Sequence, residues 1–148
     1  MLLIMVFGVG LGFKIGDLNE FYPVYQRSGG DEFALQNDLS RFITIITFEL
    51  AYAIDFFWVE LFFRGFLVLA FTRWFGGHAV LIMVSTYVFA HYGKPLTEII
   101  GSCFGAYILG ILTYHTRSVW TGIVLHIGIA WISELFGFFN LADIFLNN

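Results

Sequence analysis

Long apolar runs separated by short polar connections are the feature that most constrains the fold of this chain. Hydrophobic residues make up 59% of the 148 residues and charged residues only 12%, about half of the roughly 25% found in soluble domains. So few charges cannot cover a soluble domain, and a membrane-spanning helix needs about 20 apolar residues. The sequence therefore predicts an all-α polytopic bundle of about five membrane segments. These segments cover approximately residues 1–13, 42–72, 79–92, 96–114 and 119–139.

The first 41 residues differ from the rest of the chain. Residues 14–41 hold most of the soluble-type charge, a proline and a Gly-Gly pair, which is typical of an extramembrane loop. Residues 1–13 lack the basic start and the cleavage pattern of a signal peptide, and they are short for a membrane span. We therefore divide the chain into an N-terminal membrane segment with its loop, 1–41, and a membrane core, 42–148. A truncated bundle is one interpretation of the short first segment.

Charge and cysteine content exclude several classes of function. The net charge of −4 is not gathered in one block, so no basic groove for nucleic acid is indicated, and the lipid bilayer is the expected partner. Cys103 is the only cysteine, which excludes an internal disulfide and a multi-cysteine zinc site. Two acids of the apolar runs, Glu49 and Glu134, are interpreted as residues near the membrane interface.

Besides Asp55, the apolar runs contain the ionisable residues Glu60, Arg64, His91 and His126, which come from three different segments. An ionised group at the membrane centre costs at least about 2.5 to 3.5 kcal/mol, so it needs a partner, a wet cavity or a function. Glu60 and Arg64 are four residues apart, in the favourable order for an ion pair on one helix, and a purely structural pair is an open alternative. His91 and His126 have no sequence-local partner. Together the four residues indicate a built site.

The side chains of this set suit the activation of a water molecule. A carboxylate in a low-dielectric environment can act as a general base, and histidines can orient the water or donate to a developing oxyanion. This chemistry hydrolyses peptide bonds. Histidine with carboxylate is also a zinc ligand set, so a divalent metal such as zinc on Glu60, His91 and His126 remains open. The HExxH helix of common zinc proteases does not occur in the sequence.

Three short motifs follow one another between residues 55 and 131. Residues 59–65 read VELFFRG and resemble an EExxxR signature, often EExxFRG. Residues 87–91, YVFAH, resemble an FxxxH motif. The glycine-containing run 101–110, the turn 116–120 and residues 126–130, HIGIA, are similar to a glycine-rich helix, a turn and an HxxxN motif. In this order the motifs resemble the CPBP family of membrane proteins, also called the CAAX prenyl protease 2 or Abi family.

The resemblance implies a metallopeptidase-like intramembrane endopeptidase in a bacterial or archaeal cell membrane, acting on a peptide or a prenylated protein. Carried over from the family, the activation of water falls on Glu60 and His91. His126 would stabilise the transition state or bind a metal. Arg64 would orient the glutamate or hold its helix in place.

Two positions depart from the family pattern. Val59 stands where the first glutamate of the pair is expected, and Ala130 stands where the asparagine is expected. Adjacent helical residues point about 100° apart, so Glu60 does not simply replace a residue at 59. Asp55 lies one turn before Val59 on nearly the same face, and we hypothesise that it supplies the missing carboxylate. A lone acid facing a water-filled vestibule is the alternative.

These departures leave three functions open. The first is an intramembrane endopeptidase that uses a glutamate- and histidine-activated water. The second is a catalytically impaired protein of the same fold that binds or protects a membrane partner, as in immunity. The third is a small proton-coupled transport component, which would place Glu60, His91 and His126 along a continuous water path.

Overall fold

The computed structural model describes residues 2–141, and within this range the chain forms helices, turns and loops without a strand. The prediction of an all-α fold is confirmed. The elements are α1 (Leu2–Ile15), η1 (Leu18–Glu20), α2 (Val24–Arg27), α3 (Gly30–Gln36), α4 (Arg41–Glu60), η2 (Leu61–Ala70), α5 (Thr72–Phe75), η3 (Gly76–His78), α6 (Ala79–Ala90), α7 (Leu96–Thr116) and α8 (Trp120–Phe139).

Three helical stretches of the described chain are long and apolar enough to cross a membrane: Arg41–Ala90, Leu96–Thr116 and Trp120–Phe139. Large apolar side chains are exposed along all three, among them Trp58 at 62%, Phe104 at 67% and Val124 at 68%. Isolated exposed apolar residues are ordinary on soluble proteins, but a surface rich in them marks contact with lipid or with a partner. The chain is an integral membrane protein.

The described residues form two compact units, and each is considered by itself. Unit 1 comprises the described residues within Met1–Asp55 and Gly128–Asn148, and unit 2 comprises Phe56–Ile127. The boundaries of the units fall inside α4 and inside α8. The division at residue 41 separates a loop region from a membrane core by composition, whereas the two units are defined by compactness. The division at residue 41 stays a prediction.

Unit 2 is built on the packing of α6 against α7 and η2. Its apolar core consists of Phe63, Leu67, Val68, Val80, Met83, Tyr87 and Ala106. Gly110 on α7 allows the close approach of α6, because a Cβ at this position would lie 2.6 Å from Met83 Cε and 2.8 Å from Val80 Cγ1. Small residues at helix contacts have this effect in membranes, where no hydrophobic force drives helices together.

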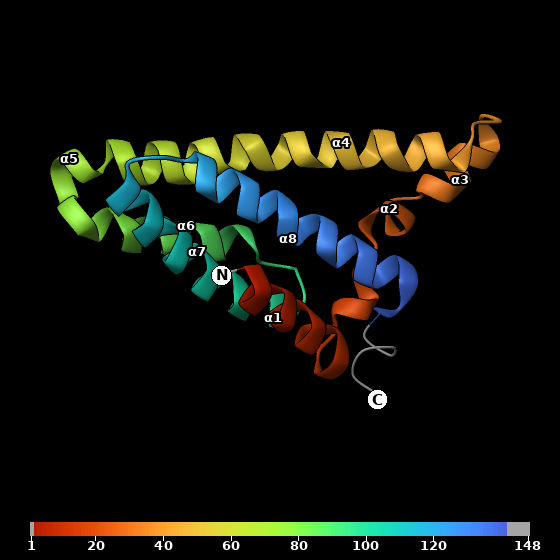
Figure 1. Ribbon diagram of the computed structural model, residues 1–148, viewed down its shortest axis with the longest axis horizontal. Helices are drawn as coiled ribbons and strands as arrows, with labels where there is room; N and C mark the ends of the chain where they lie inside the picture. The colour runs from red at the N-terminus through yellow and green to blue at the C-terminus, as the bar shows by residue number, and fades with distance from the viewer. Residues whose placement is uncertain (1, 142–148) are drawn as a thin grey trace. The chain divides into compact units, whose positions relative to one another are not determined.

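A sharp reversal precedes α6. Gly76 begins η3 with a φ of +53°, a region of backbone space that glycine enters without steric cost. After the short connection that follows α6, α7 runs back alongside it (Figure 1). The start of α6 and the end of α7 consequently lie at the same end of unit 2.

Unit 1 contains a buried acid with a structural task. Glu134 on α8 is 2% exposed, and its Oε1 and Oε2 accept hydrogen bonds from the backbone N–H groups of Val24 (2.7 Å) and Tyr25 (3.4 Å). These are the first two residues of α2, whose N–H groups have no partner inside the helix. Glu134 thus caps α2, whereas the sequence had suggested only a place near the membrane interface.

Candidate functional site

Glu60 and Arg64 form a buried ion pair at the junction of α4 and η2. Both side chains are almost completely inaccessible, at 0% and 1% exposure, and Arg64 Nη1 lies 2.7 Å from Glu60 Oε1. The helix changes from α to π hydrogen bonding directly after Glu60, and π-helical segments are frequent at functional sites. Removing one member of a buried pair typically costs about 3–5 kcal/mol, because the other charge is left without compensation.

His126 on α8 joins the same carboxylate from a second helix. Its Nδ1 lies 2.7 Å from Glu60 Oε1. A carboxylate only accepts hydrogen bonds, so Nδ1 carries the proton and donates it. In the neutral ring Nε2 then holds a lone pair, and it accepts a hydrogen bond from the Tyr87 hydroxyl at 3.1 Å. The ring of Phe56 packs against the imidazole with centroids 4.3 Å apart, which fixes the plane of the ring.

Tyr87 on α6 is the centre of the site, and sequence reasoning did not single it out. Besides its bond to His126, its ring lies 4.6 Å from the Arg64 guanidinium carbon and packs edge-on against Phe63 at 4.9 Å. Its backbone carbonyl accepts a hydrogen bond from His91 Nδ1 at 2.9 Å. The available signal was a tyrosine at the phenylalanine position of the FxxxH motif, because its hydroxyl adds a donor to an otherwise apolar helix.

His91 follows the last residue of α6 and is partly exposed. Since Nδ1 donates to the Tyr87 carbonyl, Nε2 is the ring atom with a lone pair. Burial lowers the pKa of His91, an effect that outweighs the opposing effect of the backbone carbonyl. The ring is therefore neutral at pH 7 and able to accept a proton at Nε2.

The second oxygen of Glu60 has a different environment from the first. Among the described residues, Oε2 is buried and accepts no hydrogen bond. Gly122 on α8 faces this atom, and a Cβ at Gly122 would collide with it. A buried acceptor without a partner is rare in folded proteins. Glycine at 122 keeps the immediate surroundings of Oε2 free of a side chain.

The two positions that depart from the family motifs lie in different surroundings. Val59 packs against the apolar core of unit 2, a cluster that includes Tyr87. Ala130 is buried in unit 1. The side chain of Asp55 is exposed on α4, and its suggested role as a substitute carboxylate stays a hypothesis.

The structure brings Glu60, Arg64 and His126 into direct contact and links His91 to them through Tyr87. In the described part of the chain, however, no three His, Cys, Asp or Glu side chains lie close enough together to hold a metal ion. The metal set of Glu60, His91 and His126 stays a prediction.

Comparison with known proteins identifies the family. A family model described as type II CAAX prenyl endopeptidase Rce1-like matches residues 41–132. No curated protein and no solved structure matches the chain. The matched range covers more than half of the 148 residues and includes the whole network from Glu60 to His126. This chain belongs to the type II CAAX prenyl endopeptidase Rce1-like family, a family of intramembrane proteases.

Proposed function

We propose that this chain is an intramembrane endopeptidase that hydrolyses a peptide bond in a peptide or prenylated protein substrate in a bacterial or archaeal cell membrane. The observation that carries the proposal is the carboxylate of Glu60. One oxygen is held by Arg64 and His126, and the other is buried without a protein partner in the described chain. Family membership supports the reaction class.

The reaction begins with a water molecule bound to Glu60 Oε2. His126 donates a hydrogen bond to Oε1, and Arg64 Nη1 lies 2.7 Å from the same oxygen. Oε2 is left to accept a hydrogen bond from the water. His91 Nε2 takes the proton of that water as its oxygen attacks the carbonyl carbon of the substrate. The C–N bond then breaks, and His91 returns the proton to the leaving nitrogen. A positioned base of this kind contributes typically 10²–10⁴-fold to the rate.

His126 acts in this proposal as a positioning residue. Both of its ring nitrogens are engaged, Nδ1 by Glu60 and Nε2 by Tyr87. The role in oxyanion stabilisation that the family resemblance implies would need Nε2 to be protonated and released by the Tyr87 hydroxyl. We assign His126 and Tyr87 to the alignment of Glu60, and Arg64 to the compensation of its charge.

A specific observation favours a second function. Position 59 is valine and packs against the apolar core, so the unit does not hold a second carboxylate at the position where the family motif has one. A catalytically impaired protein of this fold would use the same buried site to bind or protect a membrane partner. In this alternative the Glu60–Arg64–His126 network is a structural remnant.

The deciding experiment measures cleavage of a prenylated CAAX-type reporter and of a membrane-peptide library by the purified full chain in lipid. We expect cleavage by the wild type and its loss in Glu60→Gln and His91→Ala. Glu32→Gln, an exposed glutamate of α3, is the matched control. Loss of cleavage in Asp55→Asn as well would support its role as substitute carboxylate.

The opposite outcome is equally informative. If a well-folded wild type cleaves no substrate while the double variant Val59→Glu with Ala130→Asn does, the endopeptidase proposal is wrong and the chain is a binder. Cleavage that survives in Glu60→Gln would contradict the mechanism.

A further inference from the structure

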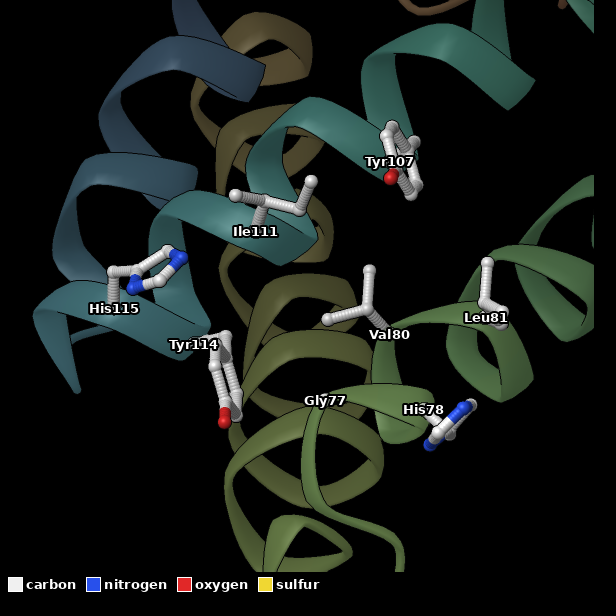
Figure 2. Close-up of a pocket in the computed structure, with 8 residues that line it drawn as sticks. All are labelled: Gly77, His78, Val80, Leu81, Tyr107, Ile111, Tyr114 and His115. Carbon is white, nitrogen blue, oxygen red and sulfur yellow. The ribbon is translucent and has the colours of Figure 1, made fainter.

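A groove between α6 and α7 lies apart from the Glu60 network and plays no part in the proposed reaction. It has a volume of about 380 Å³, within the roughly 300–1,000 Å³ range of small-molecule sites. Figure 2 shows Val80 and Leu81 on the α6 side and Tyr107 and Ile111 on the α7 side. These four side chains give the groove an apolar floor and walls.

The mouth of the groove is polar and lies at one end of unit 2. His78, directly before α6, and His115, in the last turn of α7, both line it and are both exposed. From Tyr107 to His115 the groove follows eight residues of α7, about 12 Å at 1.5 Å per residue. It therefore extends from the helix ends roughly two turns into the apolar part of the bundle.

Two arginines are close in sequence to residues that line the groove. The Arg117 guanidinium carbon lies 5.2 Å from the ring centroid of Tyr114, a residue that lines the groove. Arg73 belongs to α5, which leads directly into the groove residues Gly77 and His78, and both arginines are exposed.

Neither arginine has an acidic partner within unit 2. The only acids between residues 56 and 127 are Glu60 and Glu98. They are paired with Arg64 and with Lys94, the latter at 2.6 Å. The end of the groove thus carries positive charge that this unit does not neutralise.

Tryptophans place this end at a membrane surface. Trp74 on α5 is 67% exposed, and Trp120 at the start of α8 is 64% exposed. Exposed tryptophans collect at the boundary between hydrocarbon and headgroups. An arginine pair at headgroup level, above an apolar groove that enters the hydrocarbon, fits a ligand with an anionic head and an apolar tail.

We infer that the groove binds an anionic glycerophospholipid. The phosphate binds to Arg73 and Arg117, because hydrogen bonds between arginine and phosphate are charge-assisted and stronger than neutral ones. One acyl chain follows Val80, Leu81 and Ile111 inward. Basic pockets between membrane helices bind anionic headgroups by the same physics. This inference does not depend on the proposed hydrolytic activity.

The test counts lipids retained by the full chain in native mass spectrometry after exchange into phosphatidylglycerol or phosphatidylcholine. We expect phosphatidylglycerol to be retained preferentially. Each arginine contributes about fivefold, since a basic residue near an anionic surface is worth about 1 kcal/mol, so Arg73→Gln with Arg117→Gln should lose about 25-fold. Arg27→Gln with Arg41→Gln removes the same charge from unit 1 and should change nothing.

A second variant tests the groove itself. Leu81→Trp fills it, and we expect retention of phosphatidylglycerol to fall, whereas Phe104→Trp adds the same side chain at an exposed position of α7 outside the groove. Equal retention of the two lipids overturns the inference. So does a preference that survives Leu81→Trp, because the arginines would then act on the bilayer surface without the groove. Displacement of the phospholipid by an uncharged isoprenoid at equal concentration would also contradict it. Thermal unfolding confirms that each variant is folded.

Discussion

Two buried glutamates of this chain have different kinds of partner. Glu134 in unit 1 accepts hydrogen bonds from backbone N–H groups with both of its oxygens. Glu60 in unit 2 binds the side chains of Arg64 and His126 through one oxygen, and the other has no partner among the described residues. Both acids sit in apolar helices, so burial alone does not distinguish a structural from a reactive carboxylate. The two acids differ in the nature of their partners and in the free oxygen of Glu60, and the proposed function rests on this difference.

The largest effect is expected when Glu60 loses its charge. Glu60→Gln leaves Arg64 buried without a counter-charge, which should cost about 3–5 kcal/mol of unfolding free energy. It should also reduce cleavage by about 100-fold, because the water that His91 deprotonates would lose the carboxylate that positions it. Denaturant unfolding and reporter cleavage measure the two effects. Unchanged stability would show that the pair with Arg64 is not maintained.

The same change at Glu134 should separate the two acids. Glu134→Ala leaves the Val24 and Tyr25 N–H groups without their acceptor, and an unsatisfied buried group costs about 1–3 kcal/mol. We expect lower stability with cleavage per folded molecule retained. If Glu134→Ala abolishes cleavage in a folded protein, the contrast between a structural and a reactive glutamate breaks down.

Gly122 provides a test that alters no charge. Gly122→Ala pushes a methyl group against Glu60 Oε2, and overpacking of this kind costs typically about 1–3 kcal/mol. We expect cleavage to fall more than stability, because the oxygen proposed to bind water is obstructed. Gly101→Ala is the matched control, since a Cβ there meets nothing within 4 Å. Equal behaviour of the two variants would remove Oε2 from the mechanism.

Tyr87→Phe should have a smaller effect. It deletes the hydroxyl bound to His126 while keeping the ring that lies over Arg64, so we expect a loss of about 0.5–1.5 kcal/mol for one hydrogen bond. Cleavage should fall several-fold, and Tyr87→Leu, which also removes the aromatic face, should lose more. Identical stability and cleavage in Tyr87→Phe and wild type would show that the hydroxyl does not align His126.

The pH dependence tests His91. Burial lowers its pKa in the folded protein, so the neutral base persists below the ordinary histidine pKa of about 6.5. The pH at which the cleavage rate falls to half should therefore lie below that value, because His91 becomes protonated only at lower pH than an ordinary histidine. A midpoint above pH 6.5 would assign the titration to another group.

Much of this site could be anticipated because its signals are local. Glu60 and Arg64 sit at i and i+4 on one helix, so their pairing follows from helical geometry. The motifs around His91 and His126 placed both residues in a protease family, and the family model confirms this membership. The involvement of Tyr87 and Gly122 was not anticipated. The sequence of an apolar helix does not indicate which residue of another helix a tyrosine or a glycine will contact.

The apolar runs by themselves determined that this protein is an all-α membrane protein, because lipid requires each spanning segment to satisfy its own backbone hydrogen bonds. Tertiary structure decided the rest. It packed Val59 against the apolar core and linked Tyr87 by hydrogen bonds to His91 and His126. It also brought the Glu134 carboxylate to the backbone N–H groups of α2. It also formed the groove between α6 and α7. These features depend on which faces of helices distant in sequence meet, and helical periodicity alone does not contain that information.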